Sequence, residues 1–274
     1  MARLPALIQD CMIRPMKLTS PRRWFKASLV GAVATIGLSA FAQSVSAATP
    51  LPDPYLPSGT TGYDASYPQC GATAPAGYAF GIVGVNHGRP FTQNTCVGAE
   101  AGATSAPSLY INTGYSGAYR KNITTDCKTQ STSLPGTSAQ RQAWAIGCSE
   151  AESSYNYAKN DGAASVAMWW LDVETANSWS SSDLTLNQYT INGAASELVT
   201  LTTLAGTTLP VGIYSSASYW KAITGTGGFT PTDTQAEWDA ANATCPPSGT
   251  LGFTGDAVWL AQSTSGGVDT DTAC

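Results

Sequence analysis

Eight short apolar segments recur along residues 61–273, and Gly, Pro, Asn or Ser bounds most of them. They are rich in aromatic and β-branched residues, a composition typical of β-strands. Strands that alternate with helical patterns favour a parallel sheet. The sequence therefore predicts an α/β fold, a closed (β/α)8 TIM-like barrel in which some helices are short or missing. The predicted strands are residues 61–66, 79–86, 108–114, 166–174, 210–215, 236–241, 257–263 and 267–273.

Helical patterns lie between several of these strands. Residues 138–159 form a long, Ala-rich stretch without Pro. Residues 187–204 place apolar side chains at helical spacing, and the polar residues 181–183 before them are candidate N-caps. Residues 217–223 are long enough for one short helical turn.

Residues 1–47 differ from the rest of the chain, since they hold six Lys and Arg but one acid. A basic segment with Arg22 and Arg23 precedes an apolar stretch near residues 29–42 and a small-residue site ending at Ala47. This order is typical of a secretory signal peptide cleaved after Ala47, and the paired arginines partly match the twin-arginine type. The stretch is short for a membrane span, and an uncleaved anchor is the alternative. We expect export to the cell wall or the extracellular space.

Two further segments follow the predicted signal peptide. Residues 48–59 are rich in Pro and polar residues, which predicts a linker or an extended arm. Residues 60–274 have a length that suits one barrel domain.

The exported part of the chain is acidic. Seven of the 13 Lys and Arg lie beyond residue 47, against 17 of the 18 Asp and Glu, so the net charge there is about −10. Such a surface repels phosphate backbones and anionic lipids, so we expect no nucleic-acid partner and no membrane partner after signal removal. We expect a monomer.

Six cysteines remain after residue 47, which in an exported chain predicts three disulfides. Fifteen connectivities are open, and sequential pairing is the simplest because each bond then closes a moderate loop. No C-x-x-C spacing occurs and His87 is the only histidine, so the sequence indicates no structural zinc site and no other metal or organic cofactor.

Acidic residues fall near the ends of predicted strands. Asp64 lies in the first strand, and Asp172 and Glu174 end the fourth, behind two tryptophans. In barrels of this class the active site gathers at the C-terminal ends of the strands. Positions two apart share one strand face, about 6.5–7 Å apart. Asp239 and Asp269 are placed in the same way on later strands.

Paired carboxyl groups in one apolar cleft have a clear chemical use. Burial raises the pKa of a carboxyl group, and two acids with divergent pKa values are what glycoside hydrolysis needs. The alternative is that this D-x-E caps loop amides or forms ion pairs. Aromatic rings stack on sugar faces, and although most of the rings are expected in the core, we expect Trp170, Trp179 and Trp259 near the cleft.

Several short motifs resemble those of the family-25 glycoside hydrolases, which are lysozyme-like N-acetylmuramidases on a β/α barrel. A related group of secreted glycoside-hydrolase-like domains fits about as well. The resemblance covers nearly all of residues 60–274. The motifs are GYDAS from residue 62, WWLDVE from 169, VGIYSS from 211, VWLAQ from 258 and GGVDTD from 266.

The resemblance implies a role for each matching residue. Glu174 is then the general acid, and Asp172 orients the N-acetyl group of the substrate or a water. Asp64 is the first-strand acid of the cleft. The acid of the last-strand motif and the residues lining the sugar site are then Asp269, Tyr110 and Gln262.

Two positions depart from the pattern of the family. An acidic residue commonly follows the second strand, where this chain reads Val-Asn-His-Gly from residue 85, and Glu100 is too far downstream to replace it. An aromatic residue is common where Asn112 stands. These departures imply a different glycan or lost activity, so Asn112 and His87 join the candidate substrate-binding residues.

Three hypotheses follow. The leading one is an exported hydrolase of peptidoglycan or a related polysaccharide. The second is a catalytically inactive carbohydrate-binding or cell-surface protein on the same barrel, which the two departures favour. The third is a metal-dependent hydrolase that uses Asp64 and His87 as ligands, although such sites usually need more than one His.

Overall fold

The computed structural model describes residues 49–104, 106–163, 165–265 and 268–274. The predicted signal peptide, residues 1–47, lies outside the described residues. No helix within the described ranges is long and apolar enough to cross a membrane.

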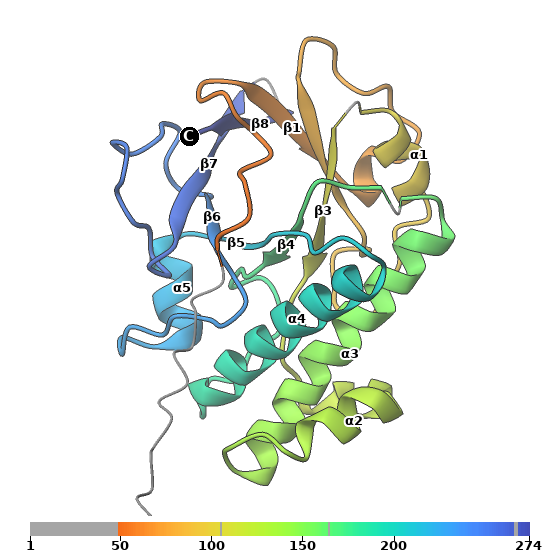
Figure 1. The fold of residues 1–274 in the computed structure, drawn as a ribbon, viewed down its shortest axis with the longest axis vertical. Helices are drawn as coiled ribbons and strands as arrows, with labels where there is room; N and C mark the ends of the chain where they lie inside the picture. Colours follow the sequence, from red (N-terminus) through yellow and green to blue (C-terminus); the bar gives the residue numbers. More distant parts are fainter. Residues whose placement is uncertain (1–48, 105, 164, 266–267) are drawn as a thin grey trace, which may run out of the picture. The chain divides into compact units, whose positions relative to one another are not determined.

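All eight predicted strands are present and close into one barrel in sequence order, which confirms the predicted fold class (Figure 1). Neighbouring strands from the first to the seventh are parallel. The strands are β1 (Thr61–Ala65), β2 (Phe80–Gly84), β3 (Pro107–Asn112), β4 (Trp169–Asp172), β5 (Val211–Ser215), β6 (Ala236–Asp239), β7 (Ala257–Ser265) and β8 (Val268–Ala273).

The eighth strand corrects the expectation of an entirely parallel sheet. β8 runs antiparallel to both β7 and β1. Only two residues separate it from β7, and a parallel return would need a crossover connection of a dozen residues or more. The reversal brings the start of β8 to the C-terminal ends of the other strands. Asp269 therefore reaches that rim from the beginning of its strand and not, as predicted, from the end.

The three predicted helices are confirmed as α3 (Ser138–Asn160), α4 (Leu184–Leu204) and α5 (Ala217–Thr224). Thr137 caps α3 by accepting the amide of Gln140, and Asp183 caps α4 by accepting the amide of Thr185. The sequence did not predict four short elements. They are the helices α1 (Val97–Gly102) and α2 (Thr125–Ser131) and the 3-10 helices η1 (Tyr67–Gln69) and η2 (Gly117–Asn122).

Two long helices cross closely on one side of the barrel (Figure 1). A Cβ added at Gly147 of α3 would lie 1.9 Å from the carbonyl oxygen of Thr190, and one at Gly193 of α4 would lie 2.1 Å from that of Trp144. Glycine at both positions is therefore required for this backbone approach. The crossing fixes the position of α3, and buried side chains of α3 contact the site described below.

Side chains alternate between two apolar cores, as expected for strands covered on both faces. One core lies between the strands and the helices and includes Leu109, Leu171 and Ile213. The other fills the barrel and includes Phe80, Trp170 and Trp238. Alternation therefore decides which residues of each strand can reach the mouth of the barrel.

Residues 48–59, predicted to be a linker or an extended arm, place one side chain at the amino-terminal end of the barrel. Tyr55 is buried, its hydroxyl donates to Ser108 Oγ at 2.8 Å, and it accepts from Trp170 Nε1 at 2.8 Å. Its ring also packs on Phe80 with the centroids 4.6 Å apart. The amino-terminal end of the barrel is thus closed by residues that precede β1.

Three disulfides join the cysteines in sequential order, as the simplest prediction had them. Cys127 is bonded to Cys148 between α2 and α3, and Cys245 to Cys274 near the end of β8. The third bond joins Cys70, in the loop after β1, to Cys96 at the start of α1. This last bond ties together two walls of the cavity described next.

Candidate active site

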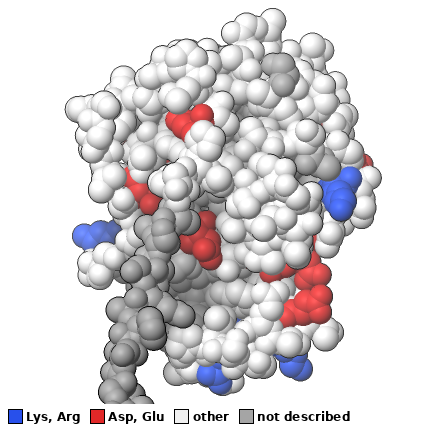
Figure 2. Space-filling model, viewed as in Figure 1, with Lys and Arg blue, Asp and Glu red and all other residues white. Residues whose placement is uncertain are grey.

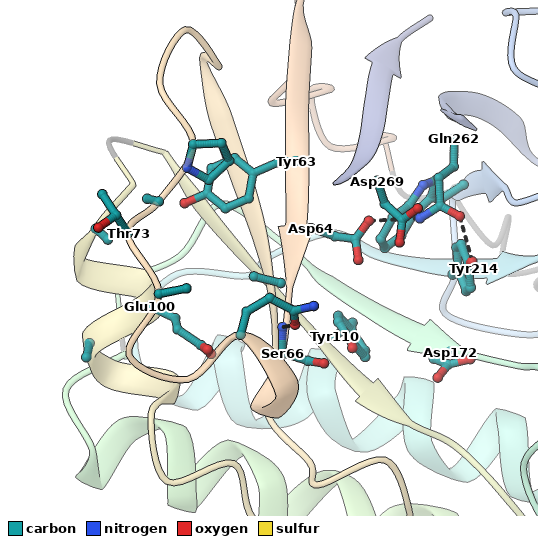
Figure 3. Close-up of a pocket in the computed structure, with 18 of the residues that line it drawn as sticks. Tyr63, Asp64, Ser66, Thr73, Glu100, Tyr110, Asp172, Tyr214, Gln262 and Asp269 are labelled. Atoms are coloured by element: carbon teal, nitrogen blue, oxygen red, sulfur yellow. Dashed lines mark hydrogen bonds between the residues drawn. The ribbon is translucent and has the colours of Figure 1, made fainter. Parts of the chain in front are cut away.

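A cavity of about 500 Å³ lies at the C-terminal ends of the parallel strands. Consecutive residues of a strand point to opposite faces, so Asp64 faces the barrel interior while Tyr63 faces α1 (Figure 3). For description we divide the lining into two groups. The inner lobe is the name used here for the residues on the strands and just after β4, which are Asp64, Tyr110, Asp172, Glu174, Tyr214, Trp238, Gln262 and Asp269, and the outer lobe for those on the outward face of β1, the loop after β1 and around α1, which are Tyr63, Gln69, Ala72, Thr73, Glu100 and Ala103.

Asp172 and Glu174 line the same inner lobe, as their spacing predicted. Pairing with β5 continues past the end of β4, because the amide of Val173 donates to the carbonyl of Tyr214 at 2.9 Å. The extended backbone therefore keeps positions 172 and 174 on one face. Asp172 is buried, with 5% of its surface exposed, whereas Glu174 is partly open to the cavity.

The backbone of Glu174 is held while its carboxyl group stays free. Trp179 Nε1 donates to its carbonyl oxygen at 2.7 Å, and the amide of Asn177 donates to the same oxygen at 3.0 Å. Among the described residues the carboxyl group of Glu174 has no hydrogen-bond partner. Burial raises its pKa. A carboxyl group with a raised pKa and no protein partner is suited to deliver a proton to a ligand.

Asp172 is held by a chain of side-chain amides. Asn112 Nδ2 donates to Asp172 Oδ2, and the backbone amide of Asn112 donates to Asn86 Oδ1 at 2.8 Å. Asn86 Nδ2 in turn donates to Glu150 Oε1 of α3 at 3.0 Å. Burial and then the charge of Glu174 raise the pKa of Asp172 well above its ordinary range, while the amide of Asn112 acts in the opposite direction.

The hydrogen bond from Asn112 to Asp172 predicts the effect of removing the Asn112 side chain. In Asn112→Ala the pKa of Asp172 should rise further, because its ionised form loses a charge-assisted hydrogen bond. Carboxyl carbon shifts followed by NMR across a pH titration measure this directly. Asn177→Ala is the matched control, since Asn177 Nδ2 lies 3.5 Å from Asp172 Oδ1 and a smaller shift is expected. An unchanged Asp172 titration in Asn112→Ala would contradict the role given to this amide.

Glu150 is a buried carboxyl group at the other end of this series of hydrogen bonds. Its burial predicts that the stability of the protein depends on pH. Burial raises its pKa to about 7, although Ser154, Asn86 and the amide of Phe91 donate to it. A pKa raised in the folded state gives stability that is fully present below about pH 4 and lost as the pH rises through 7. Glu150 alone should lower the unfolding free energy by about 3 kcal/mol over that range. Denaturant unfolding at pH 5 and pH 8.5 checks this, and greater stability at pH 8.5 would contradict it.

Asp64 is linked by hydrogen bonds to two strands that are not adjacent to β1. Gln262 Nε2 of β7 donates to Asp64 Oδ2 at 2.8 Å, and the hydroxyl of Tyr214 on β5 donates to Gln262 Oε1 at 2.8 Å (Figure 3). Burial, followed by the charges of Asp269 and Glu174, raises the pKa of Asp64 to about 7, while Gln262 opposes the shift. Asp64 therefore exchanges a proton near neutral pH.

The last strand adds a second acid below Asp269. Asp271 is fully buried inside the barrel, and neither oxygen has a hydrogen-bond partner of normal geometry among the described residues. Burial and the charge of Asp64 raise its pKa well above the ordinary range, although the indole N–H of Trp238 is near enough to oppose the shift. Burial therefore favours the neutral form of Asp271. Asp269 itself accepts the hydroxyl of Thr264 at 2.6 Å at the rim.

Six of the residues proposed from the sequence lie together in the inner lobe. The hydroxyl of Tyr110 is buried beside Ser66, and burial raises its pKa above the ordinary range. Asn112 lies behind Asp172 and does not line the cavity. The six are Asp64, Tyr110, Asp172, Glu174, Gln262 and Asp269.

Other candidates need correction. Trp170 has no exposed surface and lies in the barrel core, and Trp259, 9% exposed, packs in the same core, so neither lines the cavity. Trp179 contacts the backbone of Glu174 and packs toward the helices. His87 is exposed and stacks on Tyr67 with ring centroids 3.8 Å apart, outside the cavity lining. Asp64 thus lines the cavity, whereas His87, its partner in the metal hypothesis, does not.

Asp239 is a turn residue and not a site residue, because its carboxylate accepts the amide of Ala241 at 2.8 Å and the side-chain amide of Asn242 at 2.5 Å. Conversely, the sequence reasoning missed Tyr214, Trp238, Asp271 and Glu100. Asp271 could have been predicted, because it lies two positions after Asp269 and so shares its strand face. Glu100 was judged too far downstream, yet α1 brings it to the outer lobe.

No protein-family profile matches the chain, and no curated protein matches it. Two crystal structures of the modular Cpl-1 endolysin complexed with a peptidoglycan analogue are similar in fold. A variant bound to a tetrasaccharide-pentapeptide has a TM-score of 0.43 and 14% identity, and the wild-type endolysin has a TM-score of 0.40 and 15% identity. Each match covers 80% of this chain and 55% of that chain, so this chain spans about half of the endolysin.

Proposed function

We propose that residues 60–274 form a secreted glycoside hydrolase that cleaves peptidoglycan or a related extracellular glycan by carboxylate acid catalysis. The observation that carries the proposal is the convergence of Asp64, Asp172 and Glu174 in one inner lobe, with no basic residue among its described lining residues. Carboxyl groups that share few protons in a sheltered site supply both an acid and a charge-stabilising base. The resemblance of the sequence motifs to family-25 glycoside hydrolases agrees with this reaction.

The reaction assigns one role to each acid. Protonated Glu174 gives its proton to the glycosidic oxygen as the bond from that oxygen to the anomeric carbon breaks. The positive charge that develops on the sugar is stabilised by the carboxylates nearby, and Asp172 orients the N-acetyl group or the water. Water then adds its hydroxyl to the anomeric carbon and returns one proton to the acid cluster. Asp64, Asp269, Tyr110 and Gln262 bind the sugar around this centre.

The experiment is hydrolysis of purified peptidoglycan and of a panel of polysaccharides by the exported chain. We expect soluble fragments with new reducing ends from at least one substrate, without an added metal or cofactor. Binding without any new reducing ends would instead support the inactive carbohydrate-binding protein. That alternative is favoured by Asn86 and Asn112, which occupy positions where an acid and an aromatic residue are common, and by the engagement of both in holding Asp172.

The pH dependence of the rate follows from the raised pKa values. Asp64 has a pKa of about 7, and burial raises those of Asp172 and Glu174 as well, so the cluster retains a shared proton below neutrality. As the pH rises and the cluster loses that proton, Glu174 can no longer act as an acid. We therefore expect kcat to fall as the pH rises from 6 to 9, by about tenfold per unit at the alkaline end. A rate that increases over this range would contradict the assignment of Glu174 as the acid.

We also propose that residues 1–47 are removed on export, so that the exported protein begins at Ala48. The three disulfides support an oxidising compartment. Amino-terminal sequencing of the secreted protein should begin at Ala48.

A further inference from the structure

Three of the few basic residues of the acidic exported chain gather at one hollow. Seven Lys and Arg follow residue 47, and Arg120, Lys128 and Arg141 among them line a hollow of about 410 Å³. We call it the basic hollow, and its lining also includes Ile123, Gln142 and Ala145. It lies between η2, α2 and the start of α3, and Figure 2 shows basic side chains at that lower end of the molecule.

No acid neutralises these cations. Arg120 and Lys128 are exposed, and among the described residues their side chains make no hydrogen bond and no ion pair. Asp126 shares α2 with Lys128, but residues two apart point to different faces of a helix. None of the described lining residues of the basic hollow is Asp or Glu. Three like charges around one hollow repel one another, and a bound anion relieves that repulsion.

The walls of the basic hollow are held in place. The Cys127–Cys148 bond joins α2 to α3 directly beside Lys128. Arg141 is half-buried, and its Nη1 donates to the carbonyl oxygen of Gly136 at 2.6 Å. This bond fixes the guanidinium group and leaves its other N–H groups without a partner among the described residues. Donors that are fixed before binding lower the entropy cost of capturing a ligand.

The arrangement of the donors favours a phosphate group over a carboxylate. The three cations come from η2, α2 and α3, and so they approach a ligand from different sides, which suits the tetrahedral oxygens of a phosphate. A carboxylate presents two oxygens in one plane and is matched by the fork of a single Arg.

The size and the apolar lining of the basic hollow indicate what carries the phosphate. The hollow is larger than one phosphate group and has the volume of a small-molecule site, with Ile123 and Ala145 as apolar wall. The ligand therefore continues beyond its phosphate. None of the described lining residues is aromatic, whereas the bases of single-stranded nucleic acids stack on aromatic rings. Polyol or sugar units fit this lining better than nucleotides do.

We propose that the basic hollow binds a phosphodiester group of an anionic extracellular polymer built from polyol or sugar units. The net negative charge of the exported chain opposes polyanions at long range, but salt screens that repulsion beyond about 8–10 Å. Direct contacts with Arg120, Lys128 and Arg141 are shorter than this distance. The proposal uses the proposed export, which places the protein beside such polymers, and it does not use the hydrolytic reaction.

Calorimetry with the exported protein tests the ligand class. The probe is a glycerol-phosphate oligomer, compared with a galacturonate oligomer and an oligothymidylate of equal charge and with inorganic phosphate. We expect the glycerol-phosphate oligomer to bind about tenfold more tightly than any of the other three. An equal or higher affinity for one of them would overturn the proposal, since the hollow would then take carboxylates, nucleic acid or the free ion.

Two double variants locate the binding. Arg120→Gln with Lys128→Gln should weaken binding of the glycerol-phosphate oligomer by about tenfold or more, because two charged donors are lost. Lys159→Gln with Lys221→Gln is the matched control, since both residues are exposed, lie outside the hollow and remove the same charge. The control should bind nearly as tightly as the wild type, and both variants should keep its melting temperature. Equal weakening in the two variants would show attraction to overall charge alone and contradict the site.

The site and the proposed hydrolysis can fail separately. Neither Arg120 nor Lys128 lines the cavity that holds the acids, so their double variant should hydrolyse unmodified glycan at the wild-type rate. If the wild-type protein hydrolyses glycan but does not bind the glycerol-phosphate oligomer, the basic hollow is wrong and the hydrolase stands. If it binds the oligomer and hydrolyses no glycan, the reaction is wrong and the basic hollow stands.

Discussion

Replacing Glu174 by Gln is expected to lower the rate of glycan hydrolysis by about 10²–10⁴-fold, the usual contribution of a general acid. The amide has nearly the shape of the carboxyl group but cannot give up a proton to the leaving oxygen. The loss should appear in kcat, because the substitution leaves the lining of the inner lobe in place. Initial rates of reducing-end formation at pH 6 measure it.

The fold of this variant should be unaffected. The backbone of Glu174 is fixed by Trp179 and Asn177 through its carbonyl oxygen, and neither contact involves the carboxyl group. The melting temperature should equal or slightly exceed that of the wild type, since a partly buried acid has been removed. Asp126→Asn on the surface should change neither the rate nor the melting temperature. If the Glu174→Gln protein cleaves as fast as the wild type, Glu174 is not the general acid.

Truncating Trp170 is expected to have the largest effect on stability. Trp170 is fully buried in the barrel, where its indole N–H donates to Tyr55 and its ring contacts Trp238 edge-on at 5.7 Å. Trp170→Ala should reduce the unfolding free energy by about 3–5 kcal/mol, because it leaves a cavity in a closed core. Denaturant unfolding measures this loss.

A milder variant tests whether Trp170 binds sugar, as the sequence suggested. Trp170→Phe keeps a ring and loses the hydrogen bond to Tyr55, for an expected loss of about 1–2 kcal/mol. Its KM should equal that of the wild type. A KM raised severalfold without a loss of stability would return Trp170 to the binding site.

The strands could be predicted because apolar, aromatic and β-branched residues alternate with turn residues at each of them. Two-residue spacing likewise placed Asp172 and Glu174 on one face. The spacing does not say how far along the barrel axis a residue lies from the cavity. For this reason Trp170 was wrongly predicted to lie near the cleft. Trp170 faces inward on the same strand as Asp172 but lies two residues earlier, one layer below the cavity and against Tyr55.

Tertiary contacts determined the parts that the sequence did not predict. The reversal of β8 depends on a connection of two residues, a length that indicates a hairpin and was overlooked. Glu100 reaches the cavity because the Cys70–Cys96 bond and the short helix α1 bring residues 66–75 and 97–103 together. Asn112 was assigned to the substrate because of its position at the end of β3, whereas the structure directs its amide to Asp172.

In the proposed reaction the sheltered acids at the mouth of the barrel transfer a proton to a glycosidic bond. The most direct test is the time course of new reducing ends released from purified peptidoglycan by the wild-type protein at pH 6 and at pH 9. We expect steady release at pH 6 and a rate at least tenfold lower at pH 9, where the cluster has lost its shared proton. Tight binding of the glycan at both pH values with no reducing ends at either would contradict the claim.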